Sequence, residues 1–387
     1  MSWALIPLTE QQREIQKMAA EFAAAEIAPC AAKWDREAHF ERKVVDQMGQ
    51  LGFLGMMLPE VYDGLGLDTC TYLVALEEIA AVDASFAVAM SVHNSLPTQM
   101  ILRWGTEAQK QEFLRPMARG ESLGAFALSE PDAGSDAASL RAQAVRDGDC
   151  WVINGTKMWV TNGNTADVII AMVRTDAPEH RRGARGISAF ILTPDLPGFK
   201  VGKKEDKMGL RASPTVSLQF EDLRVPAANM LGDEGSGFVY SMLSLDHGRL
   251  GIAAQSIGIA RAALEHSVKY AAERKQFGKA IKEFQGIQFK LADMATRVAS
   301  ARALLHMAAA AKDRGGTITQ FSSMSKLIAS ETAMFATTQA IQIFGGYGYI
   351  NEYPVEKLFR DAKVTEIYEG TSEIQRIVIA RELYAQS

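Results

Sequence analysis

The stretch Trp151-Val-Ile-Asn-Gly-Thr-Lys157 lies where the character of the chain changes, and it decides how the rest is divided. Two short apolar runs flank an Asn-Gly pair, which is a strong short-range signal for a β-hairpin. Further strand-like runs follow at Val168–Val173, Ile187–Leu192 and Val216–Phe220, with turn residues between them. We therefore predict a compact all-β unit, a β-barrel, over residues 125–232.

Helices are predicted on both sides of this β unit. Upstream, Ala-rich segments carrying Glu and Lys run through residues 9–32, 41–51 and 71–100. Downstream, apolar residues recur in steps of three and four, as on the packed face of a bundle helix. The two seams are Ala253, Ile257, Ala260, Leu264, Val268 and Ile287, Leu291, Met294, Val298, Ala301, Leu305.

This order predicts a multidomain α+β protein rather than the βαβ alternation of a doubly wound fold. The predicted parts are an N-terminal all-α domain (1–124), a middle β-barrel domain (125–232) and a C-terminal helical bundle (233–387). No G-x-G-x-x-G follows a predicted strand, and Gly345-Gly346-Tyr-Gly348 follows a helical segment. A Rossmann nucleotide site is therefore not expected.

The composition narrows the class of protein. A chain of 387 residues exceeds what one hydrophobic core usually supports, and its net charge of −5 argues against nucleic-acid binding. Cys30, Cys70 and Cys150 are far apart and odd in number, which predicts no disulfides and a cytoplasmic protein. No secretory signal or membrane span is expected. The histidines form no metal-ligand pattern, so no metal site is expected either.

The segment Thr365–Arg376 contains the most informative local pattern. Ser372 and Gln375 stand at capping-box spacing, which predicts that a helix begins there. Glu369 and Gly370 would then lie on the loop entering a helix N-terminus, whose free N–H groups can receive a phosphate or an oxyanion. Taken alone, the same residues also fit a solvated acidic loop that only caps the helix.

Two further patches could face a ligand. Phe126–Asp136 carries the hydroxyls of Ser129 and Ser135 around a Pro/Gly turn, which fits either a ligand loop or an ordinary connection. Trp159 and Thr161 fall on one face of a predicted strand, because side chains alternate with period two. An indole beside a hydroxyl suits a heterocyclic ring, while a core tryptophan closing a barrel end is the simpler alternative.

In order and spacing, these patches and several others resemble the acyl-CoA dehydrogenase family over the whole chain. The matching motifs are Ala127-Leu-Ser-Glu-Pro-Asp-Ala-Gly-Ser-Asp136, Lys157-Met-Trp-Val-Thr-Asn162, Asp246-His-Gly-Arg249, Arg274-Lys-Gln-Phe-Gly278, Gln342-Ile-Phe-Gly-Gly346 and Ile367-Tyr-Glu-Gly-Thr-Ser-Glu373. The chain looks closest to the short-chain (butyryl) and short/branched-chain members. The resemblance implies that family's fold, with a C-terminal four-helix bundle, and favours a ligand site over the local alternatives.

The resemblance implies FAD-dependent dehydrogenation of short- to medium-chain acyl-CoA thioesters to trans-2-enoyl-CoA. Glu369 would be the base for the α-proton, and flavin N5 would accept the β-hydride. The residues implied in FAD binding are Phe126, Leu128, Ser129, Trp159, Thr161, Arg274, Phe277, Gln285, Gln342, Gly345, Gly346, Thr371 and Glu373. Those implied in CoA-ester binding are Ser135, Asp246, Arg249 and Gly370. Long-chain and isovaleryl members place the Glu just before the bundle arginine, where this chain has Gly248, so the base stays at Glu369.

The resemblance also implies partners. It predicts a homotetramer, a dimer of dimers, in which Arg274, Gln285 and Gln342–Gly346 reach the FAD of a neighbouring subunit, and electron-transferring flavoprotein as acceptor. Two alternatives share the scaffold: an acyl-CoA oxidase, which uses oxygen, and a flavin monooxygenase, which typically lacks the Glu. A third is a non-catalytic FAD-binding relative that scaffolds or binds nucleic acid, which should carry a basic surface that this acidic chain lacks.

Overall fold

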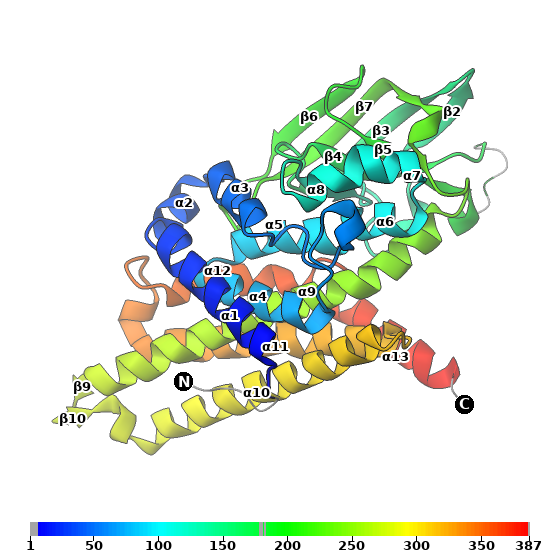
Figure 1. Cartoon of the computed structure of the whole chain (residues 1–387). Helices are drawn as coiled ribbons and strands as arrows, with labels where there is room; N and C mark the ends of the chain where they lie inside the picture. The colour runs from blue at the N-terminus through cyan, green and yellow to red at the C-terminus, as the bar shows by residue number, and fades with distance from the viewer. Residues whose placement is uncertain (1–6, 178–180, 182, 386–387) are drawn as a thin grey trace.

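Figure 1 shows the computed structural model, which describes residues 7–177, 181 and 183–385. The prediction that the chain has no secretory signal rests partly on residues 1–6, which lie outside this range. Helices occupy the chain up to residue 118, strands follow from 124 to 231, and helices return from 237. The predicted order of helices, β unit and helices is confirmed. We keep 1–124, 125–232 and 233–387 as the proposed domain limits.

The N-terminal domain is built from short helices with definite breaks. They are α1 (Glu10–Phe22), α2 (Ala31–Glu37), α3 (Arg42–Gln50), α4 (Thr69–Val82), α5 (Ala84–Ser95), α6 (Pro97–Trp104), α7 (Glu107–Gln109) and α8 (Arg115–Ala118). The helical segment predicted over 71–100 is divided into three helices. Asp83 ends α4 and caps α5 by accepting the N–H of Ser85 at 2.7 Å, and Pro97 opens α6.

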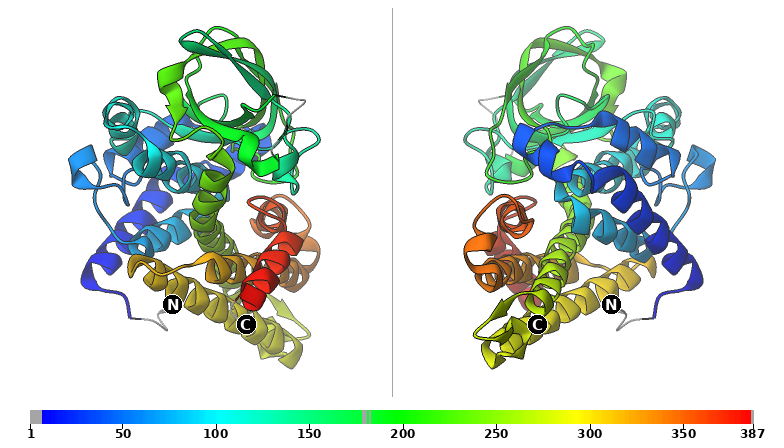
Figure 2. Two further views of the ribbon diagram at one scale, coloured as in Figure 1. Left: turned by 90° about the vertical axis from the view of Figure 1, so that its right-hand side faces the viewer. Right: turned by 90° about the vertical axis from the view of Figure 1, so that its left-hand side faces the viewer.

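The middle domain is an eight-stranded sheet that curls into an open barrel, seen end-on in Figure 2. Its strands are β1 (Gly124–Ala127), β2 (Gln143–Asp147), β3 (Cys150–Thr161), β4 (Val168–Arg174), β5 (Ile187–Leu192), β6 (Phe199–Lys204), β7 (Thr215–Pro226) and β8 (Met230–Leu231). The order is β6-β7-β3-β2-β4-β5-β8, and β1 pairs in parallel with β4. The strands predicted around residues 168, 187 and 216 are confirmed.

The hairpin predicted at Asn154-Gly155 is wrong, because β3 runs straight through it. The turn instead lies at Gly148 and Asp149, between Asp147 and Cys150, which pair across the hairpin. The pairing of β3 with β7 slips between Ile153 and Gly155, where two residues of β7 lie opposite Asn154 in a bulge. Gly155 has a φ of 148°, and a Cβ there would lie 2.5 Å from the Cβ of Ala142, so the bulge requires glycine.

The C-terminal domain holds three long helices that lie side by side in Figure 1: α9 (Gly237–Glu273), α10 (Gln285–Asp313) and α11 (Thr319–Phe344). Two shorter helices, α12 (Val355–Lys363) and α13 (Ser372–Ala385), stand where a fourth bundle helix was predicted. A short hairpin of β9 (Lys275–Gln276) and β10 (Lys279–Ala280) joins α9 to α10. The predicted seams are confirmed, since their central residues are buried in the core shared by both helical domains.

Helix α9 is the element that positions the site. It packs against α4 and α5 of the N-terminal domain and against α10 and α11 of its own. Phe86 of α5 packs on Trp34 and Phe40, with ring centroids 5.3 Å and 5.6 Å away, and therefore belongs to the core. No helix within the described ranges is long and apolar enough to cross a membrane. In the same part of the chain, no three His, Cys, Asp or Glu side chains gather as a metal would require.

Candidate active site

The loop that carries Glu369 joins α12 to α13, as predicted, but its cap differs from the prediction. Ser372 is already helical, and Thr371 is the capping residue, with its hydroxyl accepting the N–H of Ile374 at 3.3 Å. Gln375 does not complete a capping box. Its side-chain amide donates to the carbonyls of Glu369 and Gly370 at 3.1 Å and 2.9 Å, which holds the loop down on the helix.

Glu369 itself has a left-handed backbone, with a φ of 52°. This conformation costs a residue with a side chain about 1–2 kcal/mol and is maintained only where its surroundings require it. Gly370 follows with a φ of 92°, and the buried ammonium of Lys326 donates to its carbonyl at 2.8 Å. The loop is therefore fixed in a strained form from two sides, by α11 and by α13.

The Glu369 carboxylate points into the protein interior. Both of its oxygens are buried and accept no hydrogen bond from the described residues. Burial raises the pKa of Glu369 to about 7, although the positive charges of Arg249 and Lys326 act to lower it. A carboxylate that is desolvated and lacks a fixed donor is suited to exchanging a proton near neutral pH.

Two glycines on α9, one turn apart, make room for this carboxylate and for the hydroxyls beside it. A Cβ at Gly248 would come within 3.0 Å of Glu369 Oε2, and a Cβ at Gly251 would come equally close to Ser91 Oγ. The Tyr72 hydroxyl lies 3.2 Å from the same added atom at Gly251. The sequence analysis considered Gly248 but did not identify Gly251, Ser91 or Tyr72. Two glycines three residues apart in a predicted bundle helix could have indicated a close approach by other segments.

Asp246 and Arg249 lie on the part of α9 that faces α11. Arg249 Nη1 lies 2.6 Å from Asp246 Oδ1, while Asp246 Oδ2 accepts the hydroxyl hydrogen bond of Thr319 at 2.6 Å. Both charged residues are buried, and Arg249 Nε has no partner among the described residues. Ser135 is exposed on the loop between β1 and β2. The predicted substrate residues therefore come from three separate segments, of which α9 and the Glu369 loop are in contact.

The predicted ring-facing residues gather at one edge of the barrel. Phe126, Leu128 and Ser129 leave β1 beside β3, where the N–H of Met158 donates to the Ser129 carbonyl at 2.9 Å. Trp159 has a φ of 56° at a second bulge of β3, and its indole is 56% exposed. The alternative of a core tryptophan is therefore wrong. An exposed flat indole fits a bound ring system such as a flavin.

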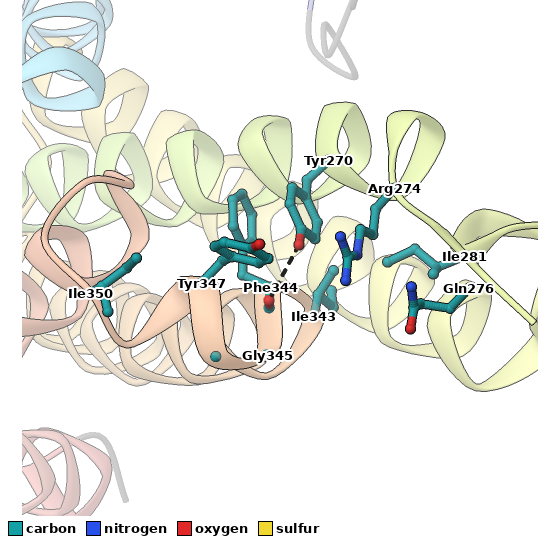
Figure 3. A pocket seen from close by; sticks show the side chains of 10 residues that line it. Tyr270, Arg274, Gln276, Ile281, Ile343, Phe344, Gly345, Tyr347 and Ile350 are labelled. Carbon is teal, nitrogen blue, oxygen red and sulfur yellow. Dashed lines mark hydrogen bonds between the residues drawn. The ribbon is translucent and has the colours of Figure 1, made fainter.

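The remaining predicted cofactor residues lie near the β9–β10 hairpin. Arg274, Gly345 and Gly346 line a pocket of about 400 Å³ there, and Figure 3 shows the guanidinium of Arg274 between Tyr347 and Gln276. A Cβ at either glycine would meet nothing within 4 Å, so the backbone is open to a ligand. Phe277, Gln285 and Gln342 are exposed nearby on the hairpin, on α10 and on α11. This cradle fits a phosphate-bearing nucleotide.

Thr371 and Glu373, also predicted to bind the cofactor, stand at the start of α13. The Thr371 hydroxyl is used in the cap, whereas the Glu373 side chain is exposed. The pKa of Glu373 is lowered by its own backbone N–H and by Thr371. Figure 1 shows the barrel and the β9–β10 hairpin at opposite ends of the molecule. Within one chain, the predicted cofactor residues therefore form separate groups.

Comparison with known proteins agrees with this architecture. Models of the acyl-CoA dehydrogenase N-terminal, middle and C-terminal domains match residues 9–121, 125–223 and 235–384. The mitochondrial short-chain specific acyl-CoA dehydrogenase of Mus musculus is 49% identical over 98% of this chain and 91% of the relative. The structure of butyryl-CoA dehydrogenase from Megasphaera elsdenii is 45% identical, with a TM-score of 0.96 over 98% of this chain and 99% of that one.

A chain in a second solved structure, described as electron transferring flavoprotein of Acidaminococcus fermentans, is 47% identical. Its TM-score is also 0.96, over 98% of this chain and 99% of that one. Three domain models in order and relatives at this identity over nearly the full length leave one assignment. The chain belongs to the acyl-CoA dehydrogenase family.

Proposed function

We propose that the protein dehydrogenates short-chain acyl-CoA thioesters to trans-2-enoyl-CoA with bound FAD, and that Glu369 is the base. The observation that carries the proposal is the Glu369 carboxylate, which is buried, held by a strained loop and without a hydrogen-bond donor among the residues described. A carboxylate without water or hydrogen-bond donors around it is a stronger base towards a substrate carbon placed against it. Its pKa of about 7 allows the ionised form to exist at neutral pH and still accept a proton readily.

In this proposal, the residues around Glu369 do separate work. Lys326 and Gln375 fix the loop, so that the carboxylate faces the slot left by Gly248 and Gly251. The buried Arg249, with Asp246 as its counter-ion, supplies positive potential that keeps the base partly ionised. Ser135, Asp246, Arg249 and Gly370 are proposed to contact the CoA ester. FAD, when bound, supplies the acceptor for the hydride from the β-carbon.

The proposed FAD site needs two copies of the chain. Phe126, Leu128, Ser129, Trp159 and Thr161 lie at the barrel edge, and Thr371 and Glu373 lie at α13. Arg274, Phe277, Gln285, Gln342, Gly345 and Gly346 gather at the far end of the bundle (Figures 1 and 3). The barrel and the β9–β10 hairpin lie at opposite ends of the chain in Figure 1. We therefore propose that the second group serves a neighbouring subunit, within a homotetramer.

Preference for short acyl chains and the electron acceptor are proposed on narrower grounds. The hydroxyls of Ser91 and Tyr72 lie close to Gly251 of α9, three residues from the Gly248 that faces Glu369. The relatives named above include a short-chain specific and a butyryl-CoA enzyme. Electron-transferring flavoprotein is proposed as acceptor because a chain 47% identical to this one belongs to a structure described as electron transferring flavoprotein of Acidaminococcus fermentans. A survey of chain lengths in which palmitoyl-CoA outperforms butyryl-CoA would contradict the short-chain preference alone.

The decisive experiment follows flavin bleaching by anaerobic stopped-flow after addition of butyryl-CoA. Glu369→Gln keeps the size of the side chain but cannot take the α-proton, so the rate should fall by about 10²–10⁴-fold with FAD content unchanged. Glu366→Gln is the matched control, because Glu366 lies three residues earlier and pairs with Lys363 at 2.7 Å. A Glu369→Gln protein that bleaches within a few-fold of the parent would remove Glu369 as the base. Rapid oxygen consumption with substrate would favour the oxidase alternative.

A further inference from the structure

A buried ion pair inside the middle domain has no role in the function proposed above. Lys157 Nζ lies 2.7 Å from Glu130 Oε1, and the two residues are 0% and 6% exposed. A buried ammonium is costly unless it is paired and fully hydrogen-bonded. Burial lowers the pKa of Lys157 to about 8, and the charge of Glu130 acts in the opposite direction. The pair is thus retained at a cost in folding free energy, which indicates a role in holding its neighbours in place.

The pair ties together several segments of the barrel edge. Besides Glu130, the ammonium of Lys157 donates to the carbonyl of Leu128 at 3.1 Å. The Glu130 carboxylate accepts the backbone N–H groups of Arg141 at 2.6 Å and Ala142 at 3.0 Å. These contacts join the exit of β1, the loop that follows it, the entry to β2 and the middle of β3.

Both halves of the proposed flavin-facing surface begin at this pair. On one side, Leu128 is bonded to Lys157 directly, and the Ser129 carbonyl accepts the N–H of Met158 at 2.9 Å. On the other side, the pairing of β3 with β7 slips between Lys157 and Val160, and this bulge turns Trp159 outward. Lys157 is thus bonded to the first half and is also part of the bulge that sets the second.

We propose that Glu130 and Lys157 are positioning residues for the flavin, holding the backbone of Leu128 and Ser129 against the strand that presents Trp159. This inference rests on the proposed function, because it requires FAD to bind at the barrel edge. Neither side chain needs to touch the cofactor. Their loss should therefore change how FAD is held and how its ring is surrounded, in addition to any change in the stability of the fold.

The test replaces both members of the pair with neutral side chains of similar size, Glu130→Gln with Lys157→Met, so that no unpaired charge is buried. The amide introduced by Glu130→Gln would retain one oxygen, which can accept the N–H of either Arg141 or Ala142 at the β2 entry. We expect the FAD dissociation constant to rise about fivefold, since a hydrogen bond of about 1 kcal/mol is lost from the surface that holds the ring. The visible absorption bands of the bound flavin should also shift.

The matched control is a second buried pair in the same domain, Arg174–Asp176, with Nε and Oδ1 2.9 Å apart. Arg174→Met with Asp176→Asn also removes a buried pair, but its contacts are to the carbonyls of Ala138, Leu140 and Gly183. The control should lower the melting temperature while leaving FAD affinity within about twofold, which is well under the effect of one hydrogen bond. Equal loosening of FAD in both double variants would show that the Glu130–Lys157 pair is merely structural.

Should the first double variant not fold, Glu130→Asp serves instead. It keeps the charge but shortens the side chain by one methylene, which should draw the ammonium away from the Leu128 carbonyl. A folded Glu130→Asp protein with the parent's FAD affinity and flavin spectrum would overturn the inference. A parent protein that takes up no FAD at all would overturn the proposed function instead, so the two failures are distinguishable.

Discussion

The buried carboxylate of Glu369 makes a quantitative prediction about stability that does not depend on catalysis. Its pKa is raised by burial from 4.5 to about 7. In the folded protein, the carboxyl therefore holds its proton over a pH range in which the unfolded chain has lost it. The resulting stabilisation is fully present below pH 4.5 and is lost as the pH rises through 7. A pKa difference of one between the folded and unfolded chain corresponds to about 1.4 kcal/mol. The free energy of unfolding should therefore fall by about 3 kcal/mol between pH 4 and pH 8.

Glu369→Gln removes this titration, because an amide is neutral at every pH. The variant and the parent should have nearly equal stability at pH 4.5, and the variant should be more stable by about 3 kcal/mol at pH 8. The measurement is thermal and guanidinium unfolding of both FAD-loaded proteins between pH 4.5 and pH 8. For a chain of this length, the difference in melting temperature should reach several degrees.

Glu373→Gln provides a control with the opposite sign. Glu373 is exposed, and its pKa is lowered by its own backbone N–H and by Thr371, so its ionised form stabilises the folded protein. The deficit of the variant relative to the parent should therefore develop as the pH rises towards 4.5 and should stay nearly constant from about pH 5 to pH 8. A stability difference between Glu369→Gln and the parent that is constant from pH 4.5 to pH 8 would refute our account of the buried carboxylate.

Three further outcomes are expected. Gly248→Ala should slow flavin reduction at least about tenfold with FAD content unchanged, because its Cβ would displace the Glu369 carboxylate; stopped-flow at the parent rate would contradict this. Gly155→Ala should destabilise the folded protein by about 1–3 kcal/mol, because the new Cβ meets Ala142. Gly148→Ala, where an added Cβ meets nothing, should destabilise it by about 1 kcal/mol. Thermal unfolding compares the two variants. The rate of flavin reduction in the parent should rise with pH through about 7, and a flat profile would count against the base.

The fold was largely predictable because its signals are local. The seam from Met294 to Leu305 can be read from a few turns of one helix, and it is buried as predicted. The hairpin was placed wrongly because two turn pairs, Gly148-Asp149 and Asn154-Gly155, lie six residues apart. What separates them is the partner strand. The Asn154 side chain exchanges hydrogen bonds with Asp222 on β7, and no local pattern contains that contact.

The site was predictable in position but not in character. Helix-start signals located the Glu369 loop, yet the neighbouring hydroxyls of Thr371 and Ser372 made the cap ambiguous by one residue. The left-handed φ of Glu369 could not be foreseen either, since it is imposed by Gln375 and by Lys326 on α11. Local sequence therefore indicated a helix entrance, and only tertiary contacts turned its acidic residue inward.

The glycines of α9 show how the position of the proposed base Glu369 depends on the shape of the helix that it faces. Gly248 and Gly251 weaken a helix that would be more stable with alanine, by about 1 kcal/mol each. Both lie where a side chain would strike a polar atom from another segment, the Glu369 carboxylate in one case and the Ser91 hydroxyl in the other. The helix thus gives up stability at the two points where groups from distant segments must enter. A carboxylate supplied by a loop far along the chain needs a position without a side chain on the helix that it faces. On α9, Gly248 is that position for Glu369.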